Sequence, residues 1–141
     1  MKKRLILLCF GLLVSIAGYS PQHKTLTIAI EPPIEPYKAL WDAVSMVEST
    51  MDSMAYNASE QATGIVQIRP IRLKDYNTRT GSRLRLSEMY NTQISKEIFF
   101  YYATKYHYTD YETIARRWNG SGYMTDIYWG KVKKHLPPKK K

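Results

Sequence analysis

Apolar residues recur at three- and four-residue steps over much of the chain after residue 36, a pattern that predicts a mainly helical domain. The first such segment follows a proline-rich stretch that ends at Pro36. Four apolar residues share one face of this predicted helix, namely Leu40, Val44, Val47 and Met51. This face would pack against the core.

Three further helices are predicted downstream. Residues 92–107 carry an apolar side that includes Ile98 and Phe99. The next helix would begin in a capping box, in which the Thr109 hydroxyl accepts from the Glu112 N–H and Glu112 reaches back, and would end before Gly120. Residues 125–136 form the last predicted helix.

The segments between these helices are polar. Residues 52–63 are rich in turn formers and predict a loop. Residues 71–91 are basic and polar, with a turn expected at 80–81. Six cations lie in or beside this stretch, namely Arg69, Arg72, Lys74, Arg79, Arg83 and Arg85. They either line a cleft for an anionic glycan strand or form a solvated face.

The two ends of the chain lie outside the predicted domain, which we place at residues 37–136. A basic start followed by a short apolar run predicts a signal peptide over residues 1–17. Residues 18–36 would be an extended arm, and residues 137–141 a basic tail. The only cysteine, Cys9, lies in the apolar run, so the mature protein would have neither a disulfide nor a thiol nucleophile.

The net charge limits the choice of partners. The formal charge is +9, and it becomes +6 once Lys2, Lys3 and Arg4 leave with the signal peptide. An exported basic protein in the periplasm or cell envelope would meet anionic wall polymer or membrane rather than nucleic acid. The alternative is that the positive net charge serves only to keep the protein soluble.

Glu48 is the candidate catalytic residue because of its place on the first helix. It follows Val47 and lies one turn after Val44, so its carboxyl borders the apolar face. Loss of hydration there favours the protonated form, which a general acid needs at neutral pH. The alternative is a glutamate whose head group reaches out to water.

Four short segments then follow one another in a characteristic order. They are Glu48-Ser49, Gly64-Ile65-Val66-Gln67-Ile68, Ala115-Arg116-Arg117-Trp118-Asn119-Gly120 and Tyr128-Trp129. In this order they resemble the lytic transglycosylase and goose-type lysozyme superfamily, whose pattern is Glu-Ser, Gly-Leu-Met-Gln-Ile, Ala-Tyr-Asn-Ala-Gly and a late Tyr. The chain departs from the pattern at Trp118, which replaces the common Tyr and has no hydroxyl, and after Asn119, where Gly120-Ser121-Gly122 replaces Ala-Gly.

This resemblance implies a mainly α, lysozyme-like single domain that acts on peptidoglycan strands as a monomer. It implies that Glu48 alone serves as acid and base, cleaving the β-1,4 bond between N-acetylmuramic acid and N-acetylglucosamine to leave 1,6-anhydro ends. The substrate-binding residues that it implies are Ser49, Gly64, Gln67, Trp118, Asn119 and Tyr128. No cofactor is expected, and the three scattered histidines predict no metal site.

Two rival functions stay open at this point. A muramidase that uses water would need a second carboxylate. The candidates are Asp42, Asp52, Glu60 and Asp75, and no spacing in the sequence favours one of them. The second rival is an envelope protein that binds glycan without cleaving it.

Overall fold

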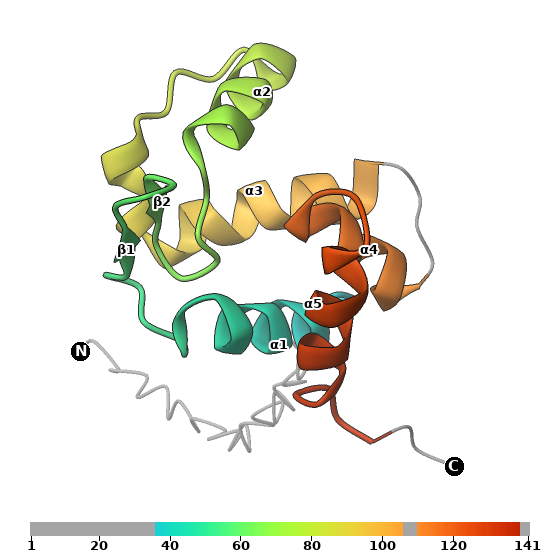
Figure 1. Ribbon diagram of the computed structural model, residues 1–141. Coiled ribbons are helices and arrows are strands. Elements are labelled where there is room, and N and C mark those ends of the chain that lie inside the picture. Colours follow the sequence, from blue (N-terminus) through green and yellow to red (C-terminus); the bar gives the residue numbers. More distant parts are fainter. Residues whose placement is uncertain (1–35, 106–109, 139–141) are drawn as a thin grey trace, which may run out of the picture. The chain divides into compact units, whose positions relative to one another are not determined.

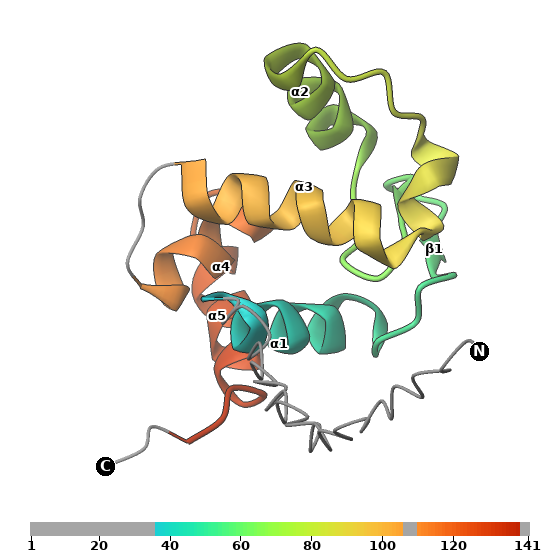
Figure 2. The same cartoon turned by 180° about the vertical axis from the view of Figure 1, so that it is seen from behind.

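The computed structural model describes residues 36–105 and 110–138. They belong to a compact unit that spans residues 33–141. Within it, α1 (Lys38–Ser49) and α3 (Thr92–Lys105) run across the domain, with a small hairpin at one end and α4 (Tyr111–Asn119) and α5 (Met124–Lys133) at the other (Figures 1 and 2). The described residues are mainly helical, which confirms the predicted fold class at that level.

The apolar face predicted for α1 packs into the core. Leu40 and Val44 are fully buried, and Trp41 packs edge-on against Phe99 of α3 at a centroid distance of 5.5 Å. The helix ends at Ser49 because Thr50 adopts a left-handed conformation. Met51 therefore lies outside the helix and is exposed, so its assignment to the buried stripe was wrong.

The helices α3, α4 and α5 lie close to the positions that the sequence predicts. Phe99 of α3 and Trp118 of α4 pack at 4.9 Å between ring centroids, which joins two helices through the core. The predicted N-cap of α4 was wrong: Asp110 is the N-cap, and its carboxylate accepts from the Thr113 N–H at 2.7 Å. Asp is as good a cap as Thr, and the sequence offered both in succession.

Four elements were missed, two short strands and two helices. The predicted loop after α1 contains a two-stranded antiparallel hairpin, β1 (Tyr56–Asn57) and β2 (Ala62–Thr63). The basic stretch contains α2 (Pro70–Thr80) and a 3-10 helix, η1 (Leu86–Tyr90). Leu73 is the one buried residue of α2, so this helix lacks the apolar stripe from which a helix is predicted. Gly81 ends α2 in a left-handed conformation, which agrees with the turn expected there.

Several predictions fall outside the described residues. They are the signal peptide, residues 18–35 of the arm, and residues 139–141 of the tail. Thr109 also lies outside the described residues. Within the described part of the chain, no helix has both the length and the apolar character required to cross a membrane.

Candidate active site around Glu48

Glu48 lies in the last turn of α1, where this helix contacts α5. The Tyr128 hydroxyl of α5 donates a hydrogen bond of 2.8 Å to Glu48 Oε1. Burial raises the pKa of Glu48 above its usual value; the Tyr128 hydrogen bond and the positive charges of Arg69 and Arg72 oppose this rise to a smaller extent. The Glu48 carboxyl is therefore desolvated, and one of its oxygens accepts a hydrogen bond from a neighbouring helix.

A polar cavity of about 80 Å³ opens beside this carboxyl. Its lining residues come from α1, the hairpin region, the loop before α2, α2 itself and the end of α4, and they are Glu48, Glu60, Gln67, Arg69, Arg72, Trp118 and Asn119. A cavity of this size has room for at least one small polar group.

The loop between β2 and α2 places Gln67 in this cavity. Gln67 has a positive φ of 51°, which is uncommon for a residue with a side chain. Its Nε2 donates to the Gly64 carbonyl at 2.9 Å and to the Ala55 carbonyl at 3.3 Å. Among the described residues, none donates a hydrogen bond to Gln67 Oε1, so this oxygen is available to accept from a hydroxyl or an amide.

Ser49 and Gly64 support this loop and do not line the cavity. The Ser49 hydroxyl donates to the Ile65 carbonyl at 2.8 Å, which ties the end of α1 to the loop. Gly64 has a φ of +80°, and a Cβ atom there would come within 2.0 Å of the Met89 carbonyl oxygen. Gly64 therefore allows two segments of the chain itself to approach closely.

The end of α4 supplies another part of the cavity wall. Trp118 is buried, and its indole Nε1 donates to the Val66 carbonyl at 3.2 Å, so α4 is joined to the same loop that carries Gln67. Asn119 also lines the cavity, and its backbone carbonyl accepts from Arg69 Nη2 at 2.9 Å. Trp118 is 5% exposed and the Arg72 guanidinium lies over its ring, so little of the ring is accessible to a sugar.

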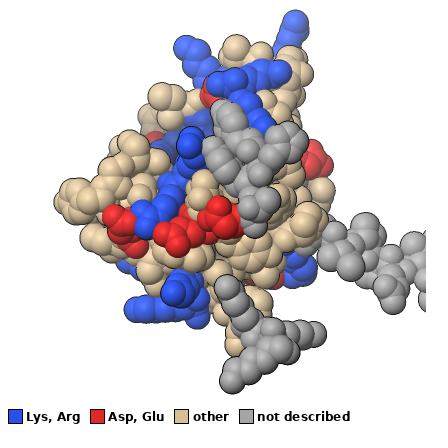
Figure 3. Space-filling model, turned by 90° about the vertical axis from the view of Figure 1, so that its right-hand side faces the viewer, with Lys and Arg blue, Asp and Glu red and all other residues tan. Residues whose placement is uncertain are grey.

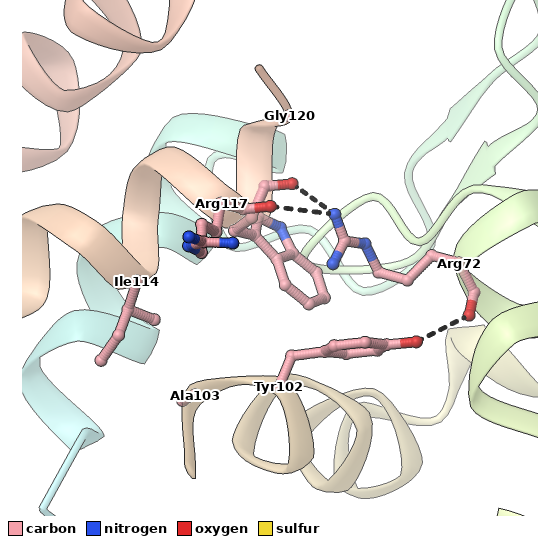
Figure 4. Close-up of a pocket in the computed structure, with 7 residues that line it drawn as sticks. Arg72, Tyr102, Ala103, Ile114, Arg117 and Gly120 are labelled. Atoms are coloured by element: carbon pink, nitrogen blue, oxygen red, sulfur yellow. Dashed lines mark hydrogen bonds between the residues drawn. The ribbon is translucent and has the colours of Figure 1, made fainter. Parts of the chain in front are cut away.

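Arg69 and Arg72 are the site residues that the sequence did not single out. Arg72 Nη2 donates to the Trp118 carbonyl at 2.6 Å, and its guanidinium lies 4.2 Å from the centre of the Trp118 ring (Figure 4). The Tyr102 hydroxyl of α3 lies 3.2 Å from the Arg72 backbone carbonyl, and its single proton is shared between this carbonyl and Asp75 Oδ2 at 2.7 Å. The sequence shows Arg69 and Arg72 three residues apart at the start of a basic stretch. This spacing did not distinguish the two arginines from the exposed cations that follow.

Of the four carboxylates considered as partners of Glu48, only Glu60 lines the cavity. Its Oε1 lies 3.8 Å from Arg69 Nη1. The others are held elsewhere: Asp42 by Lys38, Asp52 by the Met54 N–H, and Asp75 by Arg79 and the Tyr102 hydroxyl. Within residues 36–105 and 110–138, no three side chains of His, Cys, Asp or Glu gather as they would around a metal ion.

No family model matches the chain, and neither a curated protein nor a solved structure matches it.

Proposed function

We propose that this protein is a peptidoglycan lytic transglycosylase with a lysozyme-like fold, in which Glu48 is both the general acid and the general base. The observation that carries the proposal is the setting of Glu48: a desolvated carboxyl with one oxygen bound by Tyr128, at the wall of a polar cavity. Burial that raises the pKa of a carboxyl is what allows it to hold a proton at neutral pH. The motifs that resemble the family meet around this cavity through Glu48, Gln67 and Asn119.

In the proposed reaction, Glu48 transfers its proton to the oxygen that links C1 of N-acetylmuramic acid to the next sugar, and this C1–O bond breaks. The carboxylate then accepts the proton of the muramic 6-hydroxyl, whose oxygen bonds to C1 and closes the 1,6-anhydro ring. No water is consumed, and Glu48 is protonated again at the end. The 6-hydroxyl competes well with water because an oriented intramolecular group has an effective molarity of about 10⁵ M or more.

Within this proposal, Tyr128 orients Glu48 and stabilises its carboxylate form between the two proton transfers, since its hydroxyl donates to Oε1. Gln67 Oε1 and the Asn119 side chain, which both line the cavity, would bind polar groups of the sugar. Ser49 and Gly64 would act indirectly, by holding the loop that carries Gln67.

A second candidate function, hydrolysis by a muramidase, is favoured by the position of Glu60. Its carboxylate lines the same cavity as Glu48 and could activate a water molecule. Two features make it the weaker candidate: the Glu60 side chain is 53% exposed, and Arg69 lies 3.8 Å from it.

The proposal includes export to the periplasm or cell envelope, because that is where the substrate lies. Its support is the basic and apolar start of the sequence together with the positive charge of the chain. An anionic wall polymer would attract such a protein over about 8–10 Å near physiological salt.

The test is the activity of Glu48→Gln on purified peptidoglycan, with Glu97→Gln as the control. Glu97 is an exposed residue of α3, so its change removes the same charge away from the cavity. General acid–base catalysis contributes about 10²–10⁴-fold, and we expect a loss of this size in Glu48→Gln and none in the control. Near wild-type activity of Glu48→Gln would overturn the proposal, whereas loss of activity in Glu60→Gln would favour the muramidase.

A further inference from the structure

Two guanidinium groups converge on the space beside Glu48. Arg69 immediately precedes α2, and Arg72 lies in its first turn. Both line the cavity that contains Glu48, and both also line a neighbouring cavity of about 300 Å³ with Ile71, Asp75 and Tyr102. The same two arginines, at the start of α2, therefore line two adjoining cavities.

Few carboxylates of the described residues engage these two arginines directly. Glu60 lies 3.8 Å from Arg69 and is half exposed. Asp75, in the second cavity, is already bound by Arg79 through two contacts of 2.8 Å and by the Tyr102 hydroxyl at 2.7 Å. Glu48 is desolvated, which favours its neutral form. Among the described residues, neither arginine therefore donates a hydrogen bond to a carboxylate.

Other basic residues of the domain do have acidic neighbours. Lys38 pairs with Asp42, Arg79 with Asp75, and Arg116 with both Glu112 and Asp126. Figure 3 shows acidic side chains next to basic ones on the face of the molecule that it presents. Arg69 and Arg72 differ from these pairs, because among the described residues neither donates a hydrogen bond to a carboxylate, and an anionic ligand would supply that acceptor.

Each arginine keeps hydrogen-bond donors for such an anion. A guanidinium has five N–H groups, and the hydrogen bonds to Arg117, Trp118 and Asn119 all use Nη2 atoms. Among the described residues, no hydrogen bond is formed by Nε or Nη1 of Arg69 or Arg72. The planar fork of a guanidinium matches a carboxylate, and a cavity of about 80 Å³ admits a group of that size.

We propose that Arg69 and Arg72 bind a carboxylate of the peptide branch that peptidoglycan sugars carry, so that the protein prefers strands with acidic peptides. This inference rests on the proposed function for the identity of the polymer. In that polymer the lactyl carboxyl of muramic acid is joined to the peptide as an amide. The free carboxylates are therefore on the peptide. This peptide would branch from the sugar bound at Glu48 and extend along the second cavity past Ile71.

The test measures binding without turnover. Glu48→Gln is titrated in a calorimeter with a disaccharide–peptide fragment of peptidoglycan, and with the same fragment after amidation of its peptide carboxylates. We expect the free acid to bind about tenfold more tightly, the factor that corresponds to about 1.4 kcal/mol. In the same background, Arg69→Gln should reduce this preference to threefold or less, and Arg69→Lys should retain most of it.

Arg83→Gln is the matched control, because it removes one positive charge from the exposed segment after α2. It should keep the tenfold preference, which separates a local site from the net charge of the chain. Equal affinity for the two fragments, failure to bind either, or an unchanged preference in Arg69→Gln would overturn the inference. A preference that disappears equally in Arg83→Gln would overturn it too. A clear preference in a protein that cleaves no peptidoglycan would count against the proposed function alone.

Discussion

Replacement of Gly64 by alanine tests how the loop that carries Gln67 is held. At a φ of +80° an L-residue is strained by about 1–2 kcal/mol. The added Cβ would also lie 2.0 Å from the Met89 carbonyl oxygen, so backbone must move, and overpacking of this kind typically costs about 1–3 kcal/mol. Together these terms predict that Gly64→Ala lowers the free energy of unfolding by about 2–5 kcal/mol.

The assay is thermal unfolding followed by circular dichroism, with Gly81→Ala as the control. Gly81 has a similar φ of +73°, but nothing lies within 4 Å of its added Cβ, so only the strain of the backbone applies. Since each kcal/mol shifts the melting temperature of a domain this size by about 4–8 °C, Gly64→Ala should melt about 10 °C or more below wild type. It should also melt clearly below Gly81→Ala. Equal melting temperatures for the two variants would refute the argument that Gly64 is required by its contact with Met89.

Two further predictions concern the environment of Glu48. Because the pKa of Glu48 is raised in the folded state, the folded protein binds more protons than the unfolded one above pH 4.5, and stability falls as pH rises through the raised value. Glu48→Gln should therefore be more stable than wild type at neutral pH, with an advantage that vanishes below about pH 4; a less stable variant at pH 7 would contradict this. Tyr128→Phe removes a hydrogen bond that lowers the pKa of Glu48, so the alkaline limb of the pH–rate profile should move to higher pH, and activity at neutral pH should fall by about tenfold or more. An unchanged profile would show that this hydrogen bond does not act on the catalytic proton.

The sequence predicts those helices whose stability comes from an apolar face. In α1, α3 and α4 the buried residues recur at helical spacing, and their boundaries agree with the prediction to within a few residues. The helix α2 could not be found in this way because Leu73 is its one buried residue. Polar contacts over long range connect it to the rest of the domain, above all the hydrogen bonds from Arg69 and Arg72 to the end of α4.

The same distinction applies to the site. The motifs predicted that Glu48, Gln67, Trp118 and Asn119 would come together, and all four line one cavity. The motifs could not separate residues that face the cavity from those that support it: Ser49 and Gly64 engage the backbone of the chain instead. In the sequence, Arg69 and Arg72 could not be told apart from the other cations of the basic stretch. The path of α2 brings these two to Glu48, whereas Arg83 and Arg85 are exposed.

The ends of the product strands show whether Glu48 works without a second carboxylate. Purified peptidoglycan is digested with the wild-type protein, and the fragments are analysed by mass spectrometry. We expect the new muramic ends to be 1,6-anhydro rings, lighter by one water than reducing ends, and we expect Glu60→Gln to give the same products. Reducing ends as the main product, lost together with activity in Glu60→Gln, would contradict this expectation and make the protein a hydrolase with two carboxylates.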